Sequence, residues 1–184
     1  GGTGNDTLDG GTGNDSYLFA PGYGAETVTI GGGQDDLIFK DIRFDQLWFS
    51  RPATTNDLVI TGLSLGLSVT VNNWFTSAFN EPNKARRIVV DGKALAQSDV
   101  AQLMAAMTAV TGNIATIPSG WPATPTQAFT DALAAVWQDQ ASYEDRALYV
   151  GTTAAQTLAA NPLWIGGVRF QGAGGADTIN GGAG

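Results

Sequence analysis

Polar and apolar residues recur in a fixed order at the start of the chain. Gly1–Asp9 has the sequence GGTGNDTLD and Gly10–Leu18 has GGTGNDSYL, a period of nine residues with glycine at positions one, two and four, aspartate at position six and an apolar residue at position eight. Repetition at a fixed period is typical of coiled repeat architectures. We therefore predict that each nonapeptide is a glycine-rich turn followed by a short strand, at Thr7–Leu8 and Ser16–Tyr17, with the position-eight side chain pointing inward.

Two further nonapeptides continue the pattern after two extra residues. Pro21–Thr29 has Glu26 at position six, and Ile30–Ile38 has Asp35 there. Both keep glycine at positions two and four. The periodic segment therefore extends over the first 38 residues of the chain.

The position-six carboxylates face one another in pairs if alternate nonapeptides lie on the same side of a coil. Asp6 then faces Glu26, and Asp15 faces Asp35, with a separation of 20 residues in both pairs. Glycine-rich turns also bring peptide carbonyls close together. Calcium takes six to eight oxygen ligands at about 2.3–2.6 Å and favours carboxylates and carbonyls. The pattern therefore predicts calcium sites between successive turns.

The same pattern returns near the end of the chain. Gly172–Asn180 is a further nonapeptide with Asp177 at position six, and Gly181–Gly184 opens another. We expect the chain to be a piece of a longer array. Gly151–Leu158 is a degenerate repeat with Gln156 at position six. Because a neutral amide binds calcium poorly, we expect this turn to carry no metal.

The segment between the two groups of repeats has a different pattern. Short runs of β-branched and aromatic residues alternate with Asn, Gly, Pro and Asp, which indicates antiparallel strands joined by turns. These runs are Phe44–Ser50, Asn56–Ile60, Ser68–Phe75 and Arg87–Gly92. We expect this segment to close one end of the coil, where apolar residues and unpaired backbone would otherwise be exposed.

Two segments with helical periodicity follow. The first, Ser98–Met107, has Ser98 as its expected N-cap; the second opens with the capping box Thr124–Gln127, has Pro125 at its first helical position, and continues to Trp137. The apolar stripe of the first helix comprises Val100, Leu103, Met104 and Met107. The stripe of the second comprises Phe129, Leu133, Val136 and Trp137. We interpret both stripes as packing surfaces.

The nonapeptides in Gly1–Leu18 and Gly172–Gly184, and more weakly Pro21–Ile38, resemble the haemolysin-type calcium-binding repeats of the RTX (repeats-in-toxin) family. Residues 39–91 look like the haemolysin-type calcium-binding-related domain that follows such repeats. The resemblance implies a right-handed parallel β-roll, with calcium held between turns by position-six carboxylates and loop carbonyls. Glu26 departs from the family aspartate, and its longer side chain can widen or weaken that site.

The resemblance also implies which residues form the metal sites. Carried over position by position, these are Gly2, Gly4, Asp6, Gly11, Thr12, Gly13, Asp15, Gly22, Gly24, Glu26, Gly31, Gly33, Asp35, Gly175 and Asp177. The implied cofactor is Ca²⁺.

The predicted fold is mainly β, with parallel β-roll turns at both ends, an antiparallel β-rich middle domain and two short α-helices. Calcium-binding repeats would occupy residues 1–40 and a β-rich capping domain residues 41–95. A helical segment with a Pro/Gly connector would occupy residues 96–148, and degenerate and renewed repeats residues 149–184.

Composition limits the possible partners. The chain has 184 residues and a formal net charge of −8, which argues against nucleic acid as a partner. We interpret its basic cluster, Lys84, Arg86 and Arg87, as a solvated face. There is no cysteine, so disulfides are excluded, and no apolar run is long enough to span a membrane.

Catalytic motifs are scarce in this sequence. Gly62–Gly66 matches the Gly-x-Ser-x-Gly nucleophile motif, but it lies between two strand-like runs and the chain has no histidine. Abundant carboxylates could serve glycoside hydrolysis, yet here they lie in glycine-rich turns that suit metal binding better. We therefore predict that the chain is not an enzyme.

The function expected is that of a non-catalytic calcium-binding structural module in a larger secreted or cell-surface RTX protein of the adhesin, toxin or surface-layer type. It would fold on calcium binding after bacterial-type export, with neighbouring repeats of the parent chain as further partners. One alternative is the non-catalytic tail of a secreted hydrolase. Another is a carbohydrate-binding module, in which exposed tryptophans contact a surface or glycan partner. Its candidate rings are Trp48, Trp74, Trp121, Trp137 and Trp164.

Overall fold

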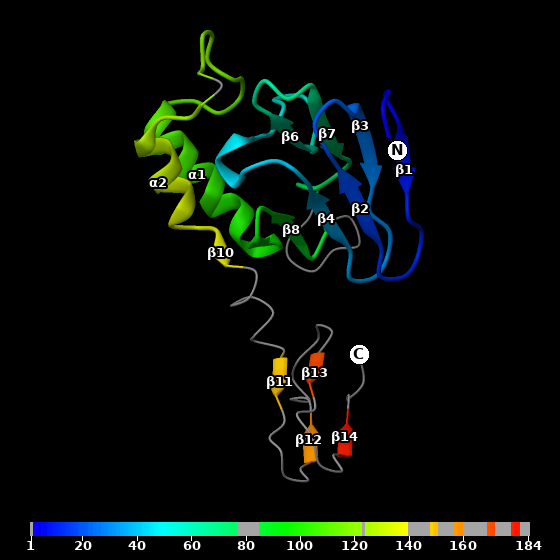
Figure 1. Cartoon of the computed structure of the whole chain (residues 1–184). Coiled ribbons are helices and arrows are strands. Elements are labelled where there is room, and N and C mark those ends of the chain that lie inside the picture. Colours follow the sequence, from blue (N-terminus) through cyan, green and yellow to red (C-terminus); the bar gives the residue numbers. More distant parts are fainter. Residues whose placement is uncertain are drawn as a thin grey trace. The chain divides into compact units, whose positions relative to one another are not determined.

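The computed structural model describes residues 2–76, 85–122 and 124–139 and four short strands beyond them (Figure 1). The chain divides into two compact units, Gly1–Gln138 and Asp139–Gly184. The fold is mainly β with two short α-helices, as predicted. No helix in the described part of the chain has the length and apolar character needed to cross a membrane.

The first unit is built on two five-stranded mixed sheets. One sheet has the order β1 (Thr7–Asp9), β3 (Gly24–Thr29), β7 (Leu67–Val71), β6 (Leu58–Gly62) and β5 (Leu47–Ser50). The other has the order β10 (Gln138–Asp139), β9 (Lys93–Ala96), β8 (Arg87–Val90), β4 (Asp36–Phe39) and β2 (Ser16–Phe19). Neither sheet closes on itself, and β1 and β2 are both edge strands.

The strands of the four N-terminal nonapeptides pair in parallel, each with the next but one in the chain. Thr7 of β1 pairs with Thr27 of β3, and Ser16 of β2 pairs with Asp36 of β4. Both registers have the 20-residue separation predicted from the sequence. Alternate nonapeptides therefore lie side by side, which places their position-six residues next to one another.

The middle segment was predicted to be antiparallel throughout, and the structure corrects this prediction. Its strands β5, β6 and β7 form antiparallel pairs, as expected, and so do β8 and β9. However, β7 also pairs in parallel with β3, and β8 pairs in parallel with β4. The segment thus adds one parallel strand to each repeat sheet, β7 beside β3 and β8 beside β4. We call these strands and their turns the third layer, after the layer of β1 and β2 and the layer of β3 and β4. The added strands pair with backbone groups of β3 and β4 that would otherwise be exposed.

A continuous hydrophobic core fills the first unit. The position-eight side chains Tyr17, Val28 and Leu37 are buried, and Leu8 packs against them half-buried, so these residues point inward as predicted. The Tyr17 hydroxyl accepts a hydrogen bond from Gly10 N (2.9 Å) and donates one to a β3 carbonyl (3.0 Å). The core contains residues from the repeats, the middle strands and both helices.

Two helices lie at the end of the first unit opposite β1 (Figure 1). Helix α1 (Val100–Thr111) follows the 3₁₀ turn η2 (Gln97–Asp99), so the helix begins later than predicted and Asp99 takes the N-cap position expected for Ser98. Three residues of its predicted stripe are buried, namely Val100, Leu103 and Met107, and Met104 is half-buried.

Helix α2 (Gln127–Ala134) begins two residues later than the predicted capping box implies. Thr126 is the N-cap, and its hydroxyl accepts a hydrogen bond from Phe129 N (3.4 Å). The helix ends before Val136 and Trp137, which are nevertheless buried in the core. The 3₁₀ turn η1 (Phe44–Gln46) packs against this helix.

The second unit is described only through two parallel strand pairs. These are β11 (Leu148–Val150) with β13 (Arg169–Gln171), and β12 (Thr157–Ala159) with β14 (Thr178–Asn180). The predicted ligands Gly175 and Asp177, the position-six Gln156 and the candidate ring Trp164 lie outside the described residues.

Candidate metal centre

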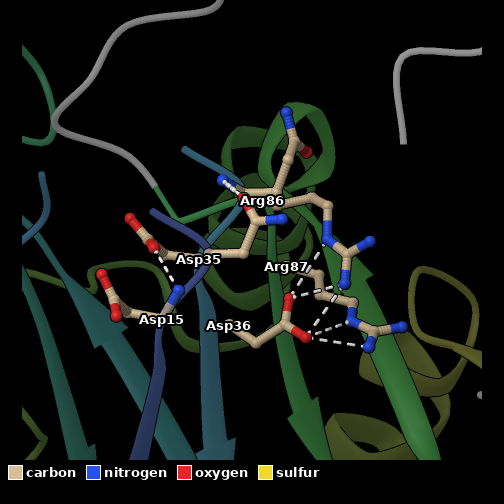
Figure 2. Close-up of polar contacts among 7 residues, drawn as sticks. Asp15, Asp35, Asp36, Arg86 and Arg87 are labelled. Atoms are coloured by element: carbon tan, nitrogen blue, oxygen red, sulfur yellow. Dashed lines mark hydrogen bonds and ion pairs between the residues drawn. The ribbon is translucent and has the colours of Figure 1, made fainter. Parts of the chain in front are cut away.

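Two position-six aspartates are joined across neighbouring turns. The Asp15 peptide N–H donates to Oδ1 of Asp35 at 2.8 Å, and Asp36 N donates to the Asp15 carbonyl at 2.9 Å. Figure 2 shows the Asp15 and Asp35 carboxylates on one side of the strands and the Asp36 carboxylate on the other. Asp35 is completely buried. Within the described residues, neither Oδ2 of Asp35 nor Oδ2 of Asp15 has a hydrogen-bond partner.

The second predicted pair lies on the other sheet. Thr27 N donates to the Asp6 carbonyl at 2.8 Å, which sets Asp6 beside Glu26. The Glu26 side chain is buried, and both of its carboxylate oxygens lack a hydrogen-bond partner among the described residues. The structure therefore brings together both pairs expected from the 20-residue separation.

The environment of Glu26 and Asp35 disfavours a negative charge on their carboxylates. Burial raises the pKa of Glu26, and the neighbouring Asp6 carboxylate raises it further. Burial also raises the pKa of Asp35; the Asp15 N–H opposes this shift, while the charges of Asp15 and Asp36 add to it. A buried carboxylate without a partner is costly unless it is neutralised or bound to a cation.

The glycine-rich loops are stacked closely. Positive φ angles occur at Gly2, Gly4, Gly11, Gly13, Gly22, Gly24 and Gly33, all of them predicted site residues. A Cβ atom added to Gly31 would collide with the Gly11 carbonyl, and one added to Gly33 would collide with the Gly13 carbonyl. Peptide oxygens of one turn thus lie against the backbone of the next.

The remaining predicted loop residues also take part in this stacking. Gly24 lies against the Gly4 carbonyl in the same way, and Thr12 forms an isolated parallel bridge with Gly32. Gly22 N donates to the carbonyl of Leu65 at 2.8 Å, so it contacts the third layer.

Two asparagines at position five connect the turns, and neither was predicted as a site residue. Asn5 Oδ1 accepts a hydrogen bond from Ala25 N at 3.0 Å, and Asn14 Oδ1 accepts one from Gln34 N at 2.8 Å. Asparagine recurs at position five of the first two repeats, and this recurrence could have indicated a structural role. Each amide links equivalent positions of two turns beside the carboxylate pair.

We expect Asn14→Ala to lower the free energy of unfolding by about 1 kcal/mol, because it removes one hydrogen bond between turns. Asn14→Asp keeps an acceptor oxygen and should cost less. Urea denaturation in saturating calcium would measure both variants. Equal losses for the two would contradict a hydrogen-bonding role for this side chain.

The basic cluster is not the solvated face that we expected. Arg86 and Arg87 both contact the carboxylate of Asp36 and are half-buried (Figure 2). Arg87 begins β8, which pairs with β4 in a register that places it opposite Asp36. Lys84 lies outside the described residues. Sequence alone gave no signal for this contact, since about 50 residues separate the partners.

The donor set suits calcium in kind. No group of three or more Asp, Glu, His or Cys side chains gathers at one point of the described residues; the carboxylates occur in pairs. Two carboxylates offer up to four oxygens, so the six to eight ligands of calcium require peptide carbonyls or water in addition. The unpartnered buried oxygens and the stacked loop carbonyls are oxygen donors of the kind that calcium takes.

The first unit offers less support for the carbohydrate-binding and catalytic alternatives. Trp48, Trp74 and Trp137 are buried, and Trp121 is half-buried beside Trp48 at a ring-centroid distance of 5.3 Å. The three buried rings are therefore not available to stack on a sugar. Gly62–Gly66 lies at the turn between β6 and β7 and not at a strand-to-helix junction.

No protein-family model matches the chain.

Proposed function

We propose that the chain is a non-catalytic calcium-binding structural module of a larger RTX-type protein, and that its repeats form a parallel β-roll. The observation that carries this proposal is the pairing, on each sheet, of a buried carboxylate with a half-buried one. Asp15 with Asp35, and Asp6 with Glu26, lie together on successive turns, and three of the four side chains have buried oxygens without a partner. Such an arrangement is unfavourable unless the carboxylates are protonated or a cation binds, and calcium is the cation that an all-oxygen donor set favours.

The proposed ligands come from both carboxylate pairs and from carbonyls of the loops that contain Gly4, Gly11 and Gly13. Calcium would supply the positive charge that these oxygens lack. The asparagine amides and interturn hydrogen bonds hold the turns at the spacing that brings the carboxylates together.

Calcium binding and folding are coupled in this proposal. Without the cation, facing carboxylates repel one another and the glycine-rich turns lose much backbone entropy on ordering. A ligand that binds only the folded state stabilises it by about 2.7 kcal/mol when its free concentration is about 100 times Kd. At the low calcium concentration of a cell interior the repeats would then be largely unfolded, and outside the cell they would be folded and rigid.

This behaviour suits a secreted or cell-surface protein, in which neighbouring repeats of the parent chain continue the stack. β1 and β2 are edge strands, and an edge strand has unpaired backbone groups with which a neighbouring repeat of the parent chain would pair. We propose bacterial-type export as the route, since a chain that folds only in calcium can cross an envelope unfolded.

A calcium titration tests the proposal. Chelator-treated protein would be titrated with calcium and separately with magnesium, while circular dichroism follows β structure and calorimetry follows binding heat. We expect a cooperative gain of β signal with calcium only. The double variant Asp15→Asn/Asp35→Asn should need more calcium for the same gain, whereas Asp41→Asn, at an exposed loop position, should titrate like the wild type. An unchanged spectrum without calcium heat would refute the proposal.

A further inference from the structure

The carboxylate of Asp36 lies at an unusual point of the repeat pattern. Position seven of the other N-terminal nonapeptides carries a small hydroxyl residue that is exposed or half-buried, namely Thr7, Ser16 or Thr27. Asp36 occupies the same position in the fourth nonapeptide and is only 8% exposed. Something other than water therefore balances its charge.

Two guanidinium groups from the third layer balance that charge. Arg86 donates from Nε and Nη2 to Oδ1 at 3.2 and 3.0 Å, and from Nη2 to Oδ2 at 3.0 Å. Arg87 donates from Nε and Nη2 to Oδ2 at 3.0 and 2.8 Å. The Arg86 and Arg87 side chains are 25% and 14% exposed. A multiply bonded, half-buried pair of this kind is stronger than an ordinary surface ion pair.

The position-six residues just before β2 and β4 lie beside one another and form a column that continues to the residue just before β8. The residue type in this column changes at that point. In the first two layers the column contains Asp15 and then Asp35. In the third layer Arg86 follows, and its N–H donates to the Asp35 carbonyl at 2.7 Å. Arg86 thus takes the register position at which a further repeat would place a carboxylate, while its guanidinium turns to Asp36 of the layer below.

We propose that Arg86 and Arg87 form with Asp36 a metal-independent clamp that joins the last repeat strand, β4, to β8. The third layer is held by protein cations and the first two layers by calcium. The clamp gives the repeats a preformed strand on which to order. The statement that calcium holds the first two layers rests on the proposed function, whereas the clamp itself does not depend on calcium.

Hydrogen exchange followed by mass spectrometry tests the clamp in the whole chain. In chelator we expect wild-type peptides from β4 to exchange about tenfold or more slowly than peptides from β2. Asp36→Asn should bring β4 to the rate of β2 while β6 keeps its protection. Asp41→Asn makes the same change of charge at an exposed residue with φ of 58°, where asparagine is well tolerated, and should leave β4 protected.

Two results would overturn the clamp, namely equal exchange of β4 and β2 in the chelated wild type, and undiminished protection of β4 in Asp36→Asn. If Asp36→Asn also exposes β6, Arg86→Gln provides a milder disruption that leaves Arg87 on the carboxylate and should accelerate exchange in β4 partially; no acceleration would count against the clamp. Calcium added to the wild type should protect β1 and β2. Failure of that last step alone would refute the calcium proposal and leave the clamp standing.

Discussion

Gly31→Ala is expected to prevent the repeat layers from stacking, whereas Gly32→Ala, one residue away, leaves them intact. A Cβ atom at Gly31 would run into the main chain of Gly11, which cannot move aside as a side chain could. A Cβ atom at Gly32 meets nothing within 4 Å. Neither residue has a positive φ angle, so the pair isolates the close approach of the turns from backbone strain.

The expected cost of Gly31→Ala is about 3 kcal/mol or more, above the usual range for overpacking, because the obstacle is backbone. Gly32→Ala should change the free energy of unfolding by less than about 1 kcal/mol. Guanidinium denaturation in saturating calcium would compare them. Similar stabilities for the two variants would show that the turns are not packed as closely as described.

Asp35→Asn should have opposite effects in the two metal conditions. The amide keeps an oxygen that can accept the Asp15 N–H, but it removes a buried charge whose pKa is raised by burial and by neighbouring carboxylates. In chelator the variant should therefore fold as well as the wild type or better. In calcium it loses a ligand, and we expect it to be about 2–3 kcal/mol less stable than the wild type.

The comparison needs circular dichroism in chelator and denaturation curves in calcium, with Glu26→Gln as the equivalent change in the other pair. Asp41→Asn serves as the control for loss of one negative charge. A loss of stability of the same size with and without calcium would mean that Asp35 is a structural hydrogen-bond acceptor and not a metal ligand.

The local pattern of the sequence was enough to predict much of the repeat geometry. A period of nine with a two-residue insertion predicted the pairing of Asp15 with Asp35, and the apolar position eight predicted the inward side chains. Both follow from spacing along a short stretch of chain, which a single sequence records directly.

Features that depend on contacts distant in sequence could not be predicted in this way. The parallel pairing of β7 with β3 and of β8 with β4 joins segments more than 40 residues apart, and nothing in the middle segment distinguishes such strands from antiparallel ones. The same limit applies to Arg86 and Arg87, whose proximity in sequence suggested a solvated cluster until β8 was placed beside Asp36.

The register of the parallel strands also bears on the time course of folding. Strand β1 pairs 20 residues ahead, and β3 pairs with Leu67–Val71 about twice as far along, whereas β5, β6 and β7 pair with their immediate neighbours in the chain. Contacts between distant segments form slowly because a long loop must close first. We therefore expect the β5–β6–β7 meander to form early and the pairing of β3 with β7 to follow more slowly. The nonapeptide strands would then dock only after residues synthesised well after them are in place.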